Sequence, residues 1–377
     1  MALSKQNKAV DGPLSGLLVV DTSQGIAGPY CASLLAQYGA RVIKVDPPHG
    51  DWGRNVGRKY GTSSVYSVAF NRGKEGLMLD LKKPDDMDVL YQMVGEADIF
   101  LESSRPGVAD KIGIGFEKLK SLKSDLIYLS VSGFGQKGAY SKRPCTDSAA
   151  QAYSGFMAGN VGVDGIAHKF DIPIIDILTG LYAFQSVSMA LFNRNRTTEA
   201  QFLDNSLVLS ALEVQKARMI DQQLHGVAAA KLNVPSGNYW AKDGELMIAL
   251  ATEDHYIEMA KVLAVPDLIE DPRFEDFGAR AENDAAVREL VQGRIEMETV
   301  AYWVEKLGAA GLICNKVNSL QEAMADPVMM ESGLLRSVTQ HAMGTLKLPA
   351  LPLTGGAELD APDLGEQSAA IRAELQS

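Results

Sequence analysis

Short apolar runs separated by amphipathic stretches dominate the first half of the sequence. Residues 17–20 form one such run, and a glycine-containing turn leads from it into a helical pattern between Pro29 and Tyr38. Pro29 suits the first position of a helix, and Gly39 suits its end. A second predicted strand, residues 41–46 (RVIKVD), follows directly. This order predicts a βαβ unit, in which a right-handed crossover joins two parallel strands.

The alternation of strand-like and helical patterns continues beyond this unit. The expected elements are a helix at 84–96, a strand within 97–104, a short helix near 115–122, a strand within 125–135, an apolar helix at 180–194 and a more mixed helix at 204–224. Alternating strands and helices are typical of an open α/β sheet, so we predict an α/β fold with a largely parallel sheet.

The pattern of apolar and polar residues changes after residue 226, where short predicted strands and acidic helical patterns replace the apolar runs. A chain of 377 residues usually divides its core between two or three domains. We therefore expect a large domain at 1–226 and a smaller α+β domain at 227–318. The remaining segment, 319–377, is rich in proline and glycine and is expected to return to the large domain.

Charge and hydropathy narrow the possible partners. The formal net charge of −11 disfavours nucleic acids and anionic membranes, because both require a basic face. An anionic ligand would need a local cluster of cations. No apolar stretch approaches the length that spans a bilayer, and the first residues lack the pattern of a secretory signal. We expect a soluble, cytoplasmic protein without membrane contact.

Cysteine and histidine positions give no sign of a metal centre. Cys31, Cys145 and Cys314 are far apart and lack CxxC spacing, so reduced thiols are expected. None of the five histidines stands at a metal-ligand spacing from another. We expect no bound metal.

The turn "SQGIAGPY" is the first candidate site. Gly25 and Gly28 precede the first helix, where backbone N–H groups and the helix dipole favour an anion. Asp46 ends the second strand, as an acidic residue does in NAD-dependent oxidoreductases. However, the glycine spacing is not GxGxxG, and two prolines follow Asp46. Dinucleotide binding and a purely structural turn both remain open from the turn alone.

A set of basic residues after the predicted strands is the second candidate. These residues are Lys44, Arg72, Lys74, Arg105 and Lys111. Ligands of open α/β sheets gather at the carboxyl ends of the strands, so the cations could bind phosphate there. The alternative is ordinary solvated charge.

Asp176, in "IPIIDILTG", is the third candidate. It lies between an apolar run and an apolar helix. An aspartate at the N-cap accepts backbone N–H bonds and stabilises a helix by about 1 kcal/mol. A shielded carboxylate can also act as a nucleophile toward an activated acyl group such as a thioester. The residues alone leave cap and catalyst equally open.

Seven segments in order resemble the class III coenzyme A transferase family, also called the CaiB/BaiF family. They are "LLVVDTSQGIAGPYCASLLAQYGARVIKVDPPHGD", "NRGKEGLMLDLK", "ADIFLESSRPGVADKIGIGFEKLK", "LIYLSVSGFGQKGAY", "TDSAAQAYSGFM", "IPIIDILTGLYAFQSVSMALFNR" and "NYWAKDGELMIAL". The resemblance implies a Rossmann-like large domain that binds CoA, a smaller α+β domain and an interlocked homodimer.

The resemblance also implies an activity and a site. In that family the aspartate of D-x-x-[TG]-G is the nucleophile, which is Asp176 here, followed by Thr179 and Gly180. It would move CoA from an acyl-CoA to a small carboxylic acid through an aspartyl anhydride and an aspartyl-CoA thioester. CoA is then a substrate, and no permanently bound cofactor is expected. Asp147 would lie near the acyl group, although alone it is typical of a cap or turn. The residues implied to contact CoA are Gly25, Ile26, Ala27, Arg72, Lys74, Ser103, Ser104, Arg105 and Lys111.

Three departures from family patterns bear on the substrate. Ile26 stands where formyl-CoA:oxalate members carry glutamine, and "PSGNYWAKDG" replaces their run of glycines. These differences favour an acid larger or less polar than oxalate. Thr146 stands where the racemase branch carries a general-base histidine, and racemisation normally needs two bases. The transferase is therefore favoured over an acyl-CoA racemase or epimerase, and a non-catalytic CoA-binding homologue is the third alternative.

Overall fold

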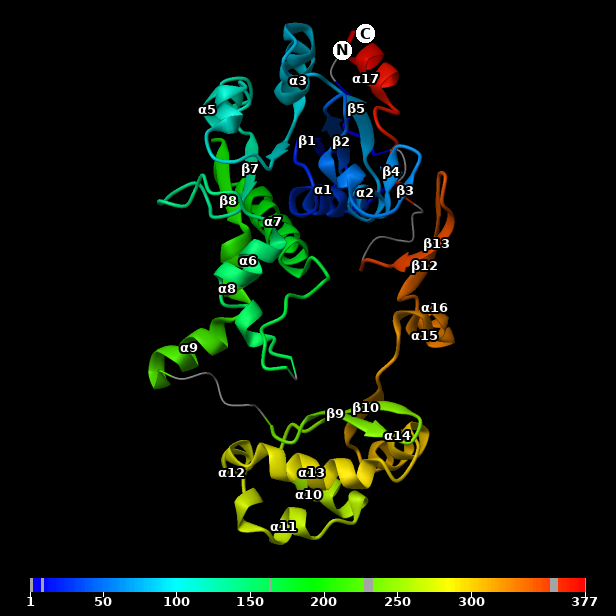
Figure 1. Cartoon of the computed structure of the whole chain (residues 1–377). Helices are drawn as coiled ribbons and strands as arrows, with labels where there is room; N and C mark the ends of the chain where they lie inside the picture. The colour runs from blue at the N-terminus through cyan, green and yellow to red at the C-terminus, as the bar shows by residue number, and fades with distance from the viewer. Residues whose placement is uncertain (1–2, 8–9, 163, 227–232, 353–358, 377) are drawn as a thin grey trace. The chain divides into compact units, whose positions relative to one another are not determined.

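The computed structural model describes residues 3–7, 10–162, 164–226, 233–352 and 359–376 (Figure 1). The chain divides into two compact units. Unit 1 comprises Met1–Lys216 and Met330–Ser377, and unit 2 comprises Ala217–Met329. The corresponding limits predicted from the sequence are residues 226 and 318. The first residue of the predicted small domain, 227, lies outside the described residues.

A six-stranded parallel sheet forms the centre of unit 1, in the order β5-β2-β1-β6-β7-β8. The strands are β1 (Leu18–Asp21), β2 (Arg41–Asp46), β5 (Glu75–Met78), β6 (Ile99–Glu102), β7 (Ile127–Ser132) and β8 (Gln201–Ser206). This sheet confirms the predicted α/β class. The expected helix at 204–224 is wrong at its start, because β8 precedes two helices, α8 (Leu207–Glu213) and α9 (Lys216–His225).

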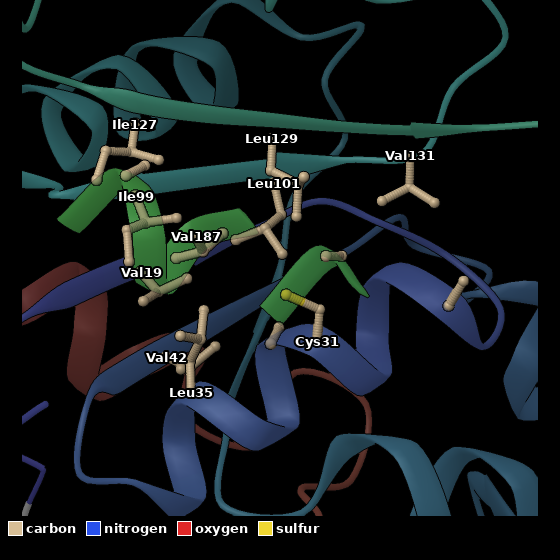
Figure 2. Packing of buried hydrophobic residues seen from close by; sticks show 14 of the residues in the cluster. Val19, Cys31, Leu35, Val42, Ile99, Leu101, Ile127, Leu129, Val131 and Val187 are labelled. Atoms are coloured by element: carbon tan, nitrogen blue, oxygen red, sulfur yellow. The ribbon is translucent and has the colours of Figure 1, made fainter. Parts of the chain in front are cut away.

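One face of the sheet packs against helices α1 (Ala27–Gln37) and α7 (Ile174–Asn193), which also contact each other. Side chains alternate between the faces of a strand. Val19 of β1 and Leu129 of β7 therefore meet Cys31 and Leu35 of α1 and Val187 of α7 in one buried cluster (Figure 2). This packing fixes the N-terminal ends of α1 and α7 relative to the sheet.

The opposite face is covered by α3 (Pro84–Glu96) and α17 (Ser368–Gln376), with Phe100 and Tyr128 among its buried residues. Shorter helices complete the unit. They are α2 (Val65–Asn71), α4 (Val108–Lys111), α5 (Phe116–Lys120), α6 (Asp147–Tyr153) and the 3-10 helix η1 (Trp52–Asn55), with hairpins of β3 (Lys59–Tyr60) and β4 (Ser63–Ser64) and of β12 (Leu335–Gln340) and β13 (Gly344–Pro349).

The last described residues form a C-terminal clasp, defined here as residues 359–376, on the β2–β5 edge of the sheet. Arg41 of β2 pairs with Glu374 at 2.9 Å, and Arg372 pairs with Asp86 of α3. The backbone N–H of Gly73 donates to the Asp360 carbonyl at 2.7 Å. Residues far apart in the sequence therefore complete one sheet edge. The C-terminal piece of unit 1 begins at Met330, whereas the segment predicted to return to the large domain begins at residue 319.

Helix α7 differs from the expectation that no apolar stretch approaches the length of a membrane span. Its 20 residues are long and apolar enough, by length and composition, to cross a membrane. However, α7 packs against α1, α8, β7 and β8, with Ala183 and Val187 fully buried. A core helix of a soluble protein passes the same test, so this single helix is weak evidence for a membrane span.

Unit 2 combines a three-stranded antiparallel sheet, in the order β11-β10-β9, with a helical cluster. Its strands are β9 (Gly237–Ala241), β10 (Gly244–Ala249) and β11 (Ile313–Lys316), and its helices are α10 (Glu253–Leu263), α11 (Asp267–Glu270), α12 (Phe277–Glu282), α13 (Asp284–Ile295), α14 (Val300–Ala309) and α15 (Leu320–Ala325). Trp303 and Phe274 lie in its core. This unit has the α+β character expected of the smaller domain.

Candidate active site

A pocket of about 350 Å³ opens in unit 1 beside the carboxyl ends of β1, β6 and β7. The N-terminal ends of α1 and α7 border it. Its lining is Thr22, Gln24, Ile26, Ala27, Gly28, Trp52, Ser103, Ser104, Arg105, Pro106, Val108, Val131, Ser132, Gly133, Ser141, Arg143, Cys145, Thr146, Asp176 and Leu207. The carboxyl edge of a parallel sheet is where open α/β proteins bind ligands.

Asp176 lies in this pocket, but it does not cap its helix. Pro173 is the N-cap residue of α7 and Asp176 is the third residue of the first turn. Asp147 supplies the cap instead. Its Oδ2 accepts the backbone N–H of Ile175 at 2.7 Å and that of Asp176 at 3.0 Å, while its Oδ1 accepts Nε2 of Gln151 at 2.6 Å. The alternative that Asp176 only caps its helix is therefore wrong, and the residue that caps α7 is Asp147.

The cap arrangement also disagrees with the implied position of Asp147 beside the acyl group. Its side chain is buried and does not line the pocket. Both of its carboxylate oxygens accept hydrogen bonds from protein groups, which holds α6 against the start of α7. In this structure Asp147 sets the position of Asp176 and is not itself presented to a ligand.

The electrostatics of Asp176 differ from those of an ordinary surface carboxylate. Burial raises its pKa to about 7, and the negative charge of Asp147 contributes to the rise. Among the described residues, none donates a hydrogen bond to the Asp176 carboxylate. A partly buried carboxylate without donors is poorly solvated, and so it is more nucleophilic than one in water.

Thr179 and Gly180 explain why α7 can place Asp176 beside α1. The Thr179 hydroxyl donates to the Ile175 carbonyl at 2.7 Å, inside the helix. A Cβ at Gly180 would lie 2.9 Å from the Ala27 carbonyl oxygen. Glycine therefore permits close approach of the two helix starts.

The turn before α1 presents free N–H groups to the pocket. Within the described part of the chain, the backbone N–H groups of Ile26, Ala27 and Gly28 have no acceptor, as expected at the start of a helix. Gly25 differs, because its N–H donates to both oxygens of Asp51 at 2.8 and 3.0 Å. Gly25 also does not line the pocket, whereas Ile26 and Ala27 do. The predicted anion-binding turn is thus formed by residues 26–28.

Gly25 is required for another reason. Its φ of +83° lies in the left-handed region, and a Cβ at this position would overlap the indole of Trp52. Trp52 thereby stands against the turn and contributes an apolar wall to the pocket. No motif in the sequence indicates this role for Trp52.

A buried network of charges lies behind the turn. It contains Asp21, Lys44, Asp46, Asp51, Arg54 and Lys74. Lys74 Nζ donates at 2.8 Å to Asp21 Oδ2, to the Pro29 carbonyl and to Asn71 Oδ1. Lys44 donates to the Ser23 carbonyl and to Asp51. The network contains three carboxylates and three cations, so its formal charges cancel. Its contacts hold the turn before α1 in place.

Several of the expected CoA contacts are not brought to the pocket. Lys74 is enclosed in the network, and Arg72 is buried and donates to the Leu359 carbonyl of the clasp at 3.0 Å. Lys111, at the end of α4, is exposed and also does not line the pocket. Lys44 belongs to the network as well. The structure brings together Ser103, Ser104 and Arg105, which do line the pocket.

We predict that Lys74→Met destabilises the protein by about 3–5 kcal/mol, because it leaves Asp21 as an unpaired buried charge. Chemical denaturation measures the change. Lys111→Met is the matched control, since an exposed lysine should change stability by less than about 0.5 kcal/mol. Unchanged stability of Lys74→Met together with a raised KM for CoA would instead favour direct contact with CoA.

Two further pocket residues, Arg143 and Cys145, come from the loop between β7 and α6. The sequence pattern indicates only a reduced thiol at Cys145 and no role for Arg143. The one sequence signal is that both residues lie close to Asp147 in the sequence. Because Asp147 contacts the first turn of α7, the loop that precedes Asp147 also lies near Asp176. Cys31, Cys145 and Cys314 are free thiols.

Unit 1 is an open parallel α/β sheet with a shielded carboxylate in a pocket at its carboxyl edge. The model of CoA-transferase family III matches residues 14–368. The chain therefore belongs to CoA-transferase family III, the class III CoA-transferases, as the resemblance implied.

Known proteins are similar over nearly the whole chain. The acetyl-CoA:oxalate CoA-transferase of Acetobacter aceti is 30% identical, covering 97% of this chain and 96% of that protein. The succinate–glutarate CoA-transferase of Agrobacterium fabrum is 30% identical, covering 97% and 96%. The crystal structure of a CaiB/BaiF family protein from Brucella suis has a TM-score of 0.83 and 30% identity, covering 97% and 100%.

Proposed function

We propose that this enzyme moves CoA from an acyl-CoA donor to a small carboxylic acid, with Asp176 as the nucleophile. The observation that carries the proposal is the carboxylate of Asp176, which shares the pocket with the free N–H groups at the start of α1. The names of the relatives, which pair an acyl-CoA or a dicarboxylate with CoA transfer, support the same reaction type.

In the first half-reaction the Asp176 carboxylate attacks the thioester carbonyl. The C–S bond breaks, giving a mixed anhydride and CoA thiolate. The thiolate then attacks the aspartyl carbonyl and releases the donor's acid as its carboxylate, which leaves CoA as a thioester on Asp176. The unpaired N–H groups of Ile26, Ala27 and Gly28 are suited to stabilise the oxyanions of these steps.

In the second half-reaction the incoming carboxylate attacks the aspartyl thioester and expels CoA thiolate. The thiolate attacks the acyl carbonyl of the new anhydride, which forms the product acyl-CoA and regenerates the Asp176 carboxylate. No proton is consumed or released overall. CoA enters as a substrate, and the chemistry requires no permanently bound cofactor.

Ser103, Ser104 and Arg105 are suited to hold CoA along one side of the pocket. Ser103 Oγ accepts the Gln24 N–H at 2.8 Å, which ties this loop to the turn before α1. Arg105 is exposed and has no carboxylate partner within the described residues. In a chain with a net charge of −11, such a local cation can attract a phosphate.

The arrangement of Asp147 disfavours a racemase. A racemase needs a base on each side of the α-carbon. Both oxygens of Asp147 are occupied by protein donors, and Thr146 rather than a base precedes it. Neither residue is placed as a free base toward the pocket.

The assay that tests the proposal has two arms. Incubation with acyl-CoA alone in deuterated water follows exchange at the α-carbon, and addition of carboxylic acids follows the formation of new CoA esters. We expect new esters without α-exchange. Exchange without transfer would favour the racemase, and the absence of both signals would favour a CoA-binding protein.

We further propose an interlocked homodimer in the cytoplasm. The exposed side of α7 carries Met189 and Phe192, and an open groove of about 720 Å³ runs along α7, β8 and α8. Such a face is typical of a subunit interface. The free thiols agree with a reducing compartment. A monomer in light scattering would contradict the dimer, and export of the tagged chain would contradict the location.

A further inference from the structure

Arg143 lines the same pocket as Asp176 but reaches it from another loop. It lies between β7 and α6, close in sequence to Cys145 and Thr146, which also line the pocket. Its backbone N–H donates to the Tyr140 carbonyl at 2.9 Å, which closes a turn. The pocket therefore holds a cation whose role the proposed reaction has not used.

The guanidinium of Arg143 rests on an aromatic platform. It lies 5.2 Å from the centre of the Tyr140 ring. That ring packs edge-on against Phe134 and Tyr153, each at 5.9 Å, and Phe134 packs against Tyr153 at 5.0 Å. A guanidinium above a ring keeps its in-plane N–H groups available. The platform thus orients Arg143 without consuming its donors.

Arg143 has no ion pair and no side-chain hydrogen bond within the described residues. Some other arginines of unit 1 are paired, among them Arg54 with Asp46 and Arg194 with Asp98, whereas Arg105 is not. Exposure alone would be ordinary for an arginine. An oriented, unpaired guanidinium in the lining of a reaction pocket is different, because it offers a bidentate site for a carboxylate.

No ion pair joins Arg143 to Asp176 among the described residues. Burial and the charge of Asp147 raise the pKa of Asp176. Cys145 is within electrostatic reach of both groups. Burial raises the pKa of its thiol, the charge of Asp176 raises it further, and the charge of Arg143 lowers it. The two charged groups therefore share the pocket without forming an ion pair that would weaken the nucleophile.

We propose that Arg143 binds the second carboxylate of a dicarboxylic acid while the first carboxylate reacts at Asp176. This inference rests on the proposed CoA transfer and names its substrate class. Trp52, Ile26 and Val131 give the pocket apolar walls for the carbon chain between the two carboxylates. A monocarboxylic acid cannot engage Arg143, because its single carboxylate is the reacting group.

Acceptor selectivity tests the proposal. With acetyl-CoA as the donor, wild-type kcat/KM is measured for succinate and glutarate and for the monocarboxylates of equal chain length, butyrate and valerate. We expect the dicarboxylates to be preferred. Arg143→Gln should lower the dicarboxylate-to-monocarboxylate ratio about 10- to 100-fold, mainly through KM, because a charge-assisted bidentate contact is lost. Arg143→Lys should recover part of that ratio.

Lys142→Gln is the matched control, since it removes the same charge from an exposed neighbour that does not line the pocket. It should keep the wild-type ratio. A wild-type enzyme without preference for dicarboxylates, or an equal loss for all acids in Arg143→Gln, would overturn the role of Arg143 while leaving CoA transfer intact. Absence of transfer to any acid would overturn the proposed function itself.

Discussion

Asp176→Asn is expected to reduce CoA transfer by about four orders of magnitude, because the amide cannot form the anhydride or the aspartyl-CoA thioester. Steady-state transfer and trapping of the acyl-enzyme with hydroxylamine measure the effect. Asp171→Asn is the matched control, since Asp171 is an exposed carboxylate shortly before α7 and does not line the pocket. Persistent trapping in Asp176→Asn would assign the nucleophile to another residue.

The same variant should change stability in a pH-dependent way. The folded state raises the pKa of Asp176 from 3.8 to about 7. Between these values the folded protein binds more protons at this group than the unfolded chain, so wild-type stability falls as the pH rises. Asn has no such titration. We therefore expect Asp176→Asn to have a higher Tm than the wild type at pH 8 and a smaller difference at pH 4, as followed by thermal denaturation.

Substitution of Asp147 is expected to have the second large effect, on both kcat and stability. Asp147→Ala removes the acceptor for the N–H groups of Ile175 and Asp176 and for Gln151. Buried donors left without partners cost about 1–3 kcal/mol. Because the same bonds hold the first turn of α7, we expect kcat to fall together with the free energy of unfolding. Denaturation and steady-state kinetics measure the two losses.

Asp147→Asn separates the charge from the cap. Its amide oxygen can still accept backbone N–H groups, but the negative charge is gone. Since that charge helps to raise the pKa of Asp176, the pKa should decrease, and the acidic limb of the pH profile of kcat/KM should move to lower pH. An unchanged limb would contradict electrostatic coupling between the two carboxylates. A merely structural role for Asp147 would not move it.

Much of the sheet could be predicted because most of its strands are buried on both faces. The sequences of β1, β2, β6 and β7 are rich in apolar residues, and the structure buries every residue of each. β8 was missed because it is an edge strand. Its sequence, QFLDNS, alternates between exposed and less exposed positions and ends directly in α8. Polar residues followed by an apolar run therefore predict one helix in place of this strand.

Only some residues of the candidate site could be predicted from the sequence. Asp176 and residues 103–105 could be placed, because they follow strands or an apolar run and the family pattern covers them. Lys74 could not, since its enclosure depends on Asp21, which is 53 positions away in the sequence. The cap likewise depends on a contact between Asp147 and Ile175 across 28 positions. Local pattern contains no signal for either pairing.

The C-terminal clasp also imposes an order on biosynthesis. Unit 1 consists of two sequence pieces, and all of Ala217–Met329 is translated between them. At about 5–20 residues per second, the ribosome needs on the order of ten seconds to pass from the first piece to the end of the chain. During that interval the nascent β2–β5 edge has no Glu374 to pair with Arg41. The domain that holds the nucleophile is therefore the last to be completed, after the smaller one has left the ribosome.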